Sequence, residues 1–207
     1  MIEENRMETT LNLVPLEPKY FEQVIELGND VHGDDYLTDE IMNTIYQKSN
    51  KDNVNCSFVM LDVSEDSSNS QSNLEKVVGF RLTYAPTLWQ ADEWCSPDLW
   101  KLPIEKLCYF KCSTVNSKYR GHGIARKMLN ASIEAVKKQG AEGGVCHTWM
   151  QSPGNVAYLY FTRCGGQHIK THSNRWLADA HNGYRCVVCL PDLYCHCDAG
   201  EMILYFD

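Results

Sequence analysis

The chain has 207 residues and a formal net charge of −8, and 43% of its residues are hydrophobic. This length is enough for one well-buried α/β domain, so we expect a single domain over residues 1–207. The acidic balance argues against a nucleic-acid partner, which needs a basic surface. The sequence contains no run of about 18 apolar residues, so no membrane-spanning segment is predicted. Residues 1–10 lack the apolar core of a signal peptide, so we expect a soluble, cytoplasmic protein.

A strand and two helices are predicted first. Residues 11–16 alternate between apolar and polar side chains, which is typical of a strand. Residues 20–27 suit a helix, and Gly28 is its expected end. A second helix should follow a loop and run through Tyr46, with Thr38 at its N-cap.

A hairpin and an insertion come next. Residues 57–63 and 77–84 are apolar and β-branched, which predicts two paired strands. The connection 65–75 is rich in Ser, Asn and Asp, so we expect a flexible loop. Residues 85–103 predict an irregular insertion whose aromatic side chains either pack over the core or line a pocket. Packing is the favoured role for its tryptophans, Trp89, Trp94 and Trp100.

The second half of the chain alternates strands and helices. Residues 107–115 predict a strand that leads into a glycine-containing turn. From Ile124, apolar residues recur at helical spacing until Lys137 and Lys138 precede Gly140, a favourable helix end. The remaining predicted elements are a strand over 144–150, a helix over 155–163, and Cys-rich C-terminal strands within 184–207, at 184–190 and 202–206.

The turn between strand and helix predicts an anion site. The first backbone N–H groups of a helix have no intrahelical partner and carry the positive end of its dipole. Gly121 and Gly123 have no side chains that would keep a phosphate from these amides. Local cations balance the acidic background, although they also suit a solvated helix start: Lys118, Arg120, Arg126 and Lys127.

The segment Arg120-Gly121-His122-Gly123-Ile124-Ala125 resembles the R/Q-x-x-G-x-G/A signature of the GCN5-related N-acetyltransferases. Further positions fit the same family: Val78-Gly79-Phe80, Trp149, Asn155, Ala157, Tyr160 and Cys164-Gly165-Gly166. A dinucleotide-binding fold is disfavoured, because Arg126 stands where its third glycine belongs. A P-loop is disfavoured too, since no Gly-Lys-Ser/Thr follows.

The resemblance implies an α/β fold with a central mixed, mostly antiparallel sheet flanked by helices. It also implies that acetyl-coenzyme A is bound, with its pyrophosphate on the turn and its pantetheine arm beside the preceding strand. The implied coenzyme-binding residues are Ser113, Thr114, Val115, Lys118, Arg120, Gly121, His122, Gly123, Ile124, Ala125 and Asn155. The implied activity is direct transfer of an acetyl group to a primary amine, in a ternary complex.

The resemblance makes Tyr160 the general acid for the leaving thiolate, with core packing as its alternative role. The general base is harder to predict, because the strand before the turn lacks the family's usual glutamate. His147 suits this role by its pKa range, although a structural histidine fits equally well. A non-catalytic acyl-coenzyme A sensor or interaction module, with a zinc-stabilised C-terminus, is therefore the alternative function.

The acceptor is expected to be a small-molecule or peptide amine. By the resemblance, the early helix-loop-helix covers the acceptor cleft. Asp34, Asp35 and Tyr36 lie in that loop, and carboxylates there would attract a cationic amine. A solvated loop is the alternative interpretation. A homodimer formed through exposed final strands is a further expectation.

Four of the ten cysteines are clustered near the C-terminus: Cys186, Cys189, Cys195 and Cys197. Four thiolates can close a tetrahedral shell around Zn²⁺, so a structural zinc site is a hypothesis. The first two converge only if the predicted strand bends or ends between them. Buried free cysteines are the alternative. The other six are scattered singly, which fits a reducing compartment better than a disulfide framework.

Overall fold

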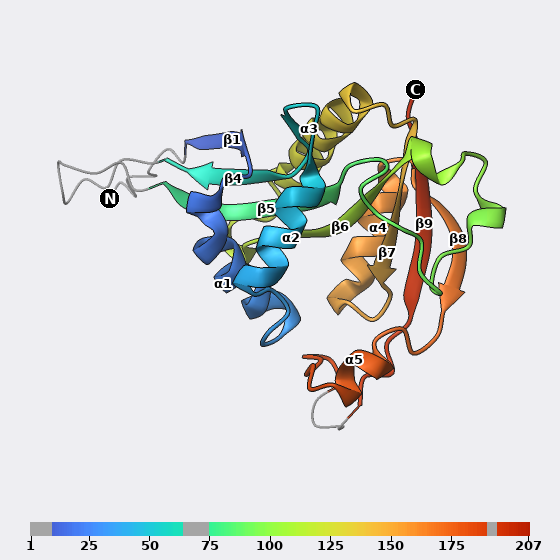
Figure 1. Ribbon diagram of the computed structural model, residues 1–207. Helices are drawn as coiled ribbons and strands as arrows, with labels where there is room; N and C mark the ends of the chain where they lie inside the picture. The colour runs from blue at the N-terminus through green and yellow to red at the C-terminus, as the bar shows by residue number, and fades with distance from the viewer. Residues whose placement is uncertain (1–9, 64–74, 190–193) are drawn as a thin grey trace, which may run out of the picture.

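The computed structural model of the protein describes residues 10–63, 75–189 and 194–207. Their main feature is a seven-stranded sheet in the order β1-β4-β5-β6-β7-β9-β8 (Figure 1). The β6–β7 pair is parallel, and the other neighbouring pairs are antiparallel. This confirms the expected mixed, mostly antiparallel sheet. The strands are β1 (Leu11–Pro15), β4 (Phe58–Asp62), β5 (Lys76–Tyr84), β6 (Leu107–Val115), β7 (Gly143–Trp149), β8 (Gln167–His172) and β9 (Ala199–Tyr205).

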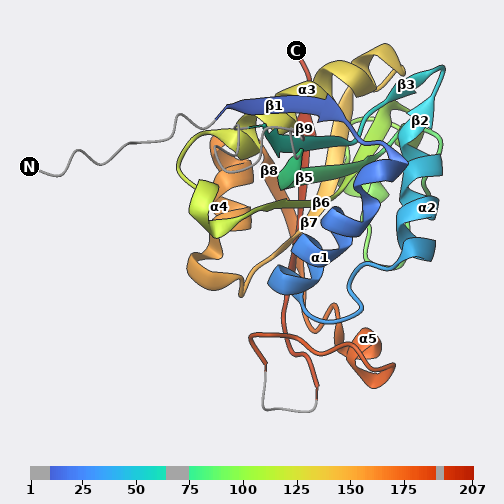
Figure 2. The ribbon, with the colours of Figure 1, turned by 90° about the vertical axis from the view of Figure 1, so that its left-hand side faces the viewer.

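Helices cover both faces of the sheet (Figure 2). On one face, α1 and α2 share a core with Phe80 and Leu82 of β5. On the other face, α3 packs on Val78 and α4 places Phe161 against Phe110. The helices are α1 (Phe21–His32), α2 (Asp39–Ser49), α3 (Ile124–Lys138), α4 (Val156–Arg163) and α5 (Leu177–His181), and β2 (Asn50–Lys51) pairs with β3 (Val54–Asn55) in a separate small hairpin.

Helix α1 does not end at Gly28 as predicted but continues to His32. A Cβ atom on Gly28 would lie 2.6 Å from Leu37 Cδ1, so glycine is needed there for close packing. The helix ends at Gly33, whose φ of +113° suits glycine and whose N–H donates to the Asn29 carbonyl. The longer helix brings His32 to the sheet. The other prediction for this region is confirmed, since the Thr38 hydroxyl accepts the Ile41 N–H and caps α2.

The predicted strand over 184–190 is wrong for the described residues 184–189. Residues 184–186 have no regular structure, and residues 187–189 form a turn. Apolar residues in this stretch suggested a strand, but Val187 and Val188 are exposed on the turn. The C-terminal strand β9 begins at Ala199, earlier than the predicted 202.

Strand β8 was not predicted, because most of its side chains are polar and exposed. It pairs with β9, which therefore lies between β7 and β8. The expectation of a homodimer assumed an exposed final strand, and that premise is wrong: β8 and β1 are the edges of the sheet. Among the described residues, no helix has the length and apolar character needed to cross a bilayer.

The insertion over 85–103 packs on the sheet, as favoured from the sequence. Trp89 and Trp100 are buried beside Leu107 and Val145. The Trp89 indole N–H donates to the Leu107 carbonyl at 2.7 Å. The other predicted loop, 65–75, lies outside the described residues except for Glu75.

Glu201 of β9 ties this insertion to the sheet. Its side chain is fully buried, at 0% exposure. One carboxylate oxygen accepts the Ser96 N–H at 2.8 Å and the Trp100 indole N–H at 2.9 Å, and the other lies 2.9 Å from His172 Nε2. Burial alone would raise the pKa of Glu201, but these hydrogen bonds outweigh it and lower the pKa.

We expect Glu201→Gln to lower the free energy of unfolding at pH 7 by about 1.5–3 kcal/mol, since one buried donor loses a charged acceptor. Because the folded pKa is lowered, the stabilisation is complete above the ordinary value of 4.5 and is lost as the pH falls through the folded value. The difference should therefore shrink in acid. Urea denaturation followed by tryptophan fluorescence measures it, with exposed Glu105→Gln as control. Equal stability at pH 7 would contradict this.

Candidate functional site

The central feature of the site is an incomplete strand pair. Strands β6 and β7 pair only over Leu107–Tyr109 and Gly143–Val145. Beyond these residues the two strands separate (Figure 1). Among the described residues, one edge of β6 is therefore without a strand partner from residue 110 to 115, in the middle of the sheet.

The backbone alternation shows which β6 groups face this unpaired edge. The Asn116 N–H donates to the Val78 carbonyl of β5 at 2.9 Å. In an antiparallel pair, alternate residues direct their N–H and C=O groups toward the same neighbour. The backbone of Thr114 therefore faces β5, and that of Ser113 and Val115 faces the unpaired edge. Thr114 contributes its side chain instead, with Oγ1 3.0 Å from His32 Nε2.

A tight turn carries this edge into α3. The short 3-10 helix η4 (Ser117–Tyr119) is capped by the Asn116 side chain, which accepts the Lys118 N–H. Gly121 and Gly123 have φ values of +85° and +72°, a region that favours glycine. A Cβ atom at either position would meet nothing within 4 Å, so the space above the turn is open.

Polar and cationic side chains surround this turn. Lys118, Arg120 and His122 are exposed, as are Gly121 and Gly123. The Arg120 Nε–H donates to the Val115 carbonyl at 3.2 Å, which holds the arginine beside the unpaired edge. Open amides at the start of a long helix, with cations beside them, suit an anionic group.

Tyr160 of α4 reaches the first turn of α3. Its hydroxyl donates to the Ala125 carbonyl at 2.8 Å and accepts from Arg81 Nη2 at 3.4 Å. Burial raises the pKa of Tyr160 to about 12, although the Arg81 charge opposes this, so the hydroxyl is protonated at neutral pH. Arg81 is only 3% exposed, and its Nε has no hydrogen-bond partner among the described residues. A buried guanidinium in this state is a second feature that suits an anion.

Solved structures resemble nearly the whole chain. A chain of the NatC complex bound to Gag peptide and CoA has a TM-score of 0.63 and 15% identity, covering 95% of this chain and 99% of that chain. Arabidopsis thaliana NAA60 in complex with acetyl-CoA has a TM-score of 0.63 and 16% identity, covering 95% and 100%. The ribosomal-protein-S18-alanine N-acetyltransferase from Escherichia coli has a TM-score of 0.59 and 11% identity, covering 95% and 94%. No protein-family model and no curated protein sequence matches the chain.

The chain has the fold of the GCN5-related N-acetyltransferases. Within this acetyltransferase fold, the turn, the unpaired edge of β6 and Tyr160 lie next to one another. The turn, the strand before it and Tyr160 are the features that the sequence resemblance implies for a coenzyme site. Asn155, another residue predicted for coenzyme binding, is the N-cap of α4 with a φ of +51°. Its side-chain oxygen is buried and has no hydrogen-bond partner among the described residues.

His147, the predicted base, is held on both sides of its ring. Nε2 lies 2.7 Å from the Trp94 carbonyl and must donate to it. Nδ1 lies 3.0 Å from the Tyr109 hydroxyl and is left to accept from it when the ring is neutral. Burial lowers the pKa of His147, which favours this neutral form. Neither nitrogen is therefore directed at the unpaired edge of β6.

A polar cluster on the α1 side of β6 was not predicted as a catalytic group. Cys112 Sγ lies 3.7 Å from His32 Nε2, and the His32 ring contacts Tyr36 with centroids 4.4 Å apart. Lys111 Nζ lies 5.8 Å from the Tyr36 ring centre. Burial alone would raise the pKa of Cys112, but His32, Tyr36 and Lys111 lower it to about 7. A cysteine at this pKa exchanges its proton near neutrality.

The predicted acceptor residues divide into two groups. Tyr36 packs in the cluster just described, whereas Asp34 and Asp35 are exposed on the turn after α1. This placement fits the solvated-loop interpretation for the two carboxylates. The sequence signal for the cluster itself was weak, because His32 and Cys112 are 80 positions apart in the chain.

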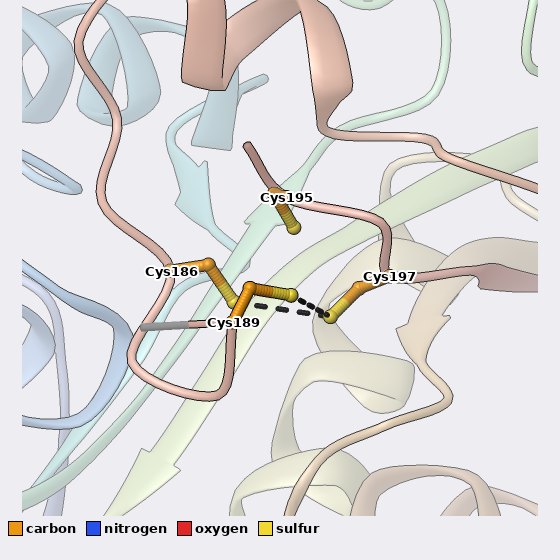
Figure 3. A group of neighbouring side chains, drawn as sticks. All are labelled: Cys186, Cys189, Cys195 and Cys197. Carbon is orange, nitrogen blue, oxygen red and sulfur yellow. Dashed lines mark hydrogen bonds between the residues drawn. The ribbon is translucent and has the colours of Figure 1, made fainter. Parts of the chain in front are cut away.

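The four C-terminal cysteines do come together (Figure 3). Their Sγ atoms all lie within 4.8 Å of one another. The turn at 187–189 reverses the chain between Cys186 and Cys189, which removes the objection raised by a straight strand. A second group, His147, His172 and Glu201, is also compact, but its Glu201 already accepts three hydrogen bonds from the protein.

Proposed function

We propose that the chain is an acetyl-coenzyme A-dependent N-acetyltransferase that moves an acetyl group to a primary amine by direct transfer in a ternary complex. The observation that carries this proposal is the unpaired edge of β6, which ends in a cation-flanked glycine turn at the start of α3. A thioester bound along that edge would lie between Tyr160 on one face of the sheet and Cys112 on the other.

The coenzyme would be held mainly by backbone groups. The amides of residues 122–125 would bind the pyrophosphate, flanked by Lys118 and Arg120. The N–H and C=O groups of Ser113 and Val115 would pair with the amides of the pantetheine arm, as an added strand does. The unpartnered Asn155 oxygen would accept a further N–H. NAA60 with acetyl-CoA and NatC with CoA show that this fold holds the coenzyme in other proteins.

We expect Arg120→Glu and Gly123→Glu each to weaken acetyl-coenzyme A binding at least 100-fold, because a carboxylate would then occupy the pyrophosphate site. Isothermal titration calorimetry measures the affinity, and circular dichroism confirms folding. Lys138→Glu is the matched control, since it reverses an exposed charge at the far end of α3. Unchanged affinity in a folded Arg120→Glu variant would contradict the site. Coenzyme binding without thiol release from any amine would instead support the non-catalytic sensor.

The leaving thiolate would take its proton from Tyr160. The attacking amine nitrogen forms a bond to the thioester carbonyl carbon, and the carbon–sulfur bond breaks when the tetrahedral intermediate collapses. The sulfur then receives the hydroxyl proton of Tyr160, and the proton that the attacking nitrogen loses as it becomes the amide restores the phenol. Arg81 lies within hydrogen-bond distance of that hydroxyl, so its charge would stabilise both the thiolate and the phenolate left behind.

Tyr160→Phe removes the proton source but keeps the ring that packs between α4 and the sheet. We expect kcat to fall about 100-fold, within the usual contribution of general acid catalysis, while the Kd for acetyl-coenzyme A changes less than about threefold. Stopped-time assays of thiol release measure kcat. Tyr158→Phe, two positions earlier on the same helix, is the control. Equal kcat values in both variants would make Tyr160 a packing residue only.

We assign the base to the His32–Cys112 pair. The Cys112 thiolate, or His32 through it, would accept the proton of the acceptor ammonium before attack. His147 then has a positioning role, because both of its nitrogens are occupied and it orients the Tyr109 hydroxyl. This assignment places acid and base on opposite faces of β6, with the thioester between them.

The pKa of Cys112, about 7, sets the expected pH dependence. The base acts when deprotonated, so kcat/KM should rise as the pH rises through this value. Cys112→Ser should remove that limb and lower kcat/KM at least tenfold at pH 7.5, whereas Cys95→Ser should keep it. Two acceptors with different amine pKa values separate the enzyme's limb from the acceptor's own titration. A limb near pH 7 that persists in Cys112→Ser would contradict the assignment.

The acceptor we propose is the free α-amine of a peptide. NatC is bound to Gag peptide, and Arabidopsis thaliana Naa50 is in complex with the bisubstrate analogue CoA-Ac-MVNAL. A putative phosphinothricin N-acetyltransferase also shares the fold, so small amines belong in the same test panel. Short peptides with free N-termini should release coenzyme A thiol faster than spermidine or phosphinothricin at equal concentration.

A further inference from the structure

The C-terminal cysteines have the geometry of a metal site. Cys197 Sγ lies 3.8 Å from Cys186 Sγ and 3.5 Å from Cys189 Sγ (Figure 3). A tetrahedron of sulfurs with metal–sulfur distances of about 2.3 Å has edges of about 3.8 Å. A disulfide would need about 2.05 Å, and all four cysteines are free. The observed spacing thus fits one central ion better than direct sulfur bonds.

Backbone amide groups also lie next to two of these sulfurs. The backbone amides of Val188 and Cys189 lie beside the Cys186 sulfur, and the Cys197 amide lies beside the Cys195 sulfur. Val187 and Val188 are 45% and 41% exposed, while three of the four cysteines are buried. A turn held by ordinary apolar packing would bury its valines. Here the side chains that point inward are the sulfurs.

The cysteine cluster and the residues just before it contact two elements beside the candidate site, β7 and the end of α1. It packs against Trp149, at the end of β7. Just before Cys186, the Tyr184 hydroxyl donates to the His32 carbonyl at 3.0 Å. The Arg185 carbonyl lies 2.5 Å from the place where a Cβ on Gly33 would stand, so the segment sits directly on the end of α1. The same end of α1 carries His32, the partner of Cys112.

We propose that Cys186, Cys189, Cys195 and Cys197 bind one Zn²⁺ as thiolates, and that this ion holds residues 184–189 against the end of α1. Binding releases the four thiol protons, and no electron is transferred. Tetrahedral all-thiolate sites suit zinc, because it has no preferred geometry of its own and is not redox active. The metal site stands without the proposed function. The further proposal that residues 184–189 border the acceptor side of the site rests on that function.

Metal content decides the first part. Protein purified without added zinc should carry about one equivalent of zinc by inductively coupled plasma mass spectrometry. Cys189→Ser and Cys197→Ser should each retain less than a fifth of it, and Cys95→Ser, a half-buried cysteine outside the cluster, should retain all of it. Refilling chelated protein with Co²⁺ should give thiolate-to-cobalt absorption. Wild-type protein with iron in place of zinc, or with less than a tenth of an equivalent of zinc and no zinc uptake, would overturn the site.

Hydrogen exchange decides the second part without any assay of transfer. Removing zinc with a chelator should speed amide exchange at least tenfold at Gly33 and Tyr36, whose N–H groups bond to Asn29 and Gly33. Exchange in α3 and the Kd for acetyl-coenzyme A should stay within twofold. Where transfer is measurable, acceptor KM should rise while coenzyme KM does not. Unchanged amide exchange at Gly33 after complete zinc removal would contradict the proposal that zinc holds this segment against α1. If zinc-loaded protein does not bind acetyl-coenzyme A at all, this result would instead count against the proposed function.

Discussion

The short parallel contact between β6 and β7 is the constraint on which the site depends. Two glycines make it possible. A Cβ on Gly144 would lie 2.4 Å from Phe110 and 2.6 Å from the Cys108 sulfur, and one on Gly143 would lie 3.0 Å from the Leu204 carbonyl. The glycines let the two strands approach over Leu107–Tyr109 and Gly143–Val145. Beyond these residues β6 has backbone groups without a strand partner among the described residues, inside the sheet.

The groups that could donate a proton and those that could accept one lie on opposite faces of the sheet, on either side of that unpaired edge. On the α3 face lie Arg81 and Tyr160, a cation and a neutral acid near the start of a helix. On the α1 face lie His32 and Cys112, which can accept a proton. Part of this division comes from strand alternation, since Arg81 of β5 pairs with Ser113, the neighbour of Cys112, and neighbouring strand residues point to opposite faces. The helices α4 and α1 supply Tyr160 and His32 from the two sides. A bound thioester would meet an acid on one side and a base on the other, as transfer to an amine requires.

Local patterns were predictable, and distant contacts were not. The helix α3, its glycine turn and the Thr38 cap depend on residues close in sequence, so their spacing predicted them. Strand β8 has few apolar side chains and is a strand mainly because β9 offers it a partner. Gly28 resembled a helix end because glycine is common there. Its packing against Leu37 depends on the fold and was not visible in the sequence. The His32–Cys112 contact joins positions 80 apart, and no periodicity reports such a pair.

The cysteines show how environment gives one residue type different chemistry. Burial raises the pKa of Cys56 and Cys146 to about 12, so these thiols behave as small apolar side chains. Cys112 is equally enclosed, but His32 reverses the effect of burial. The position of His32 depends in turn on the end of α1, which Tyr184 and the C-terminal cysteine turn hold in place. A metal ion in that turn would therefore act on the proposed transfer reaction at a distance, by fixing the histidine that keeps Cys112 ionisable.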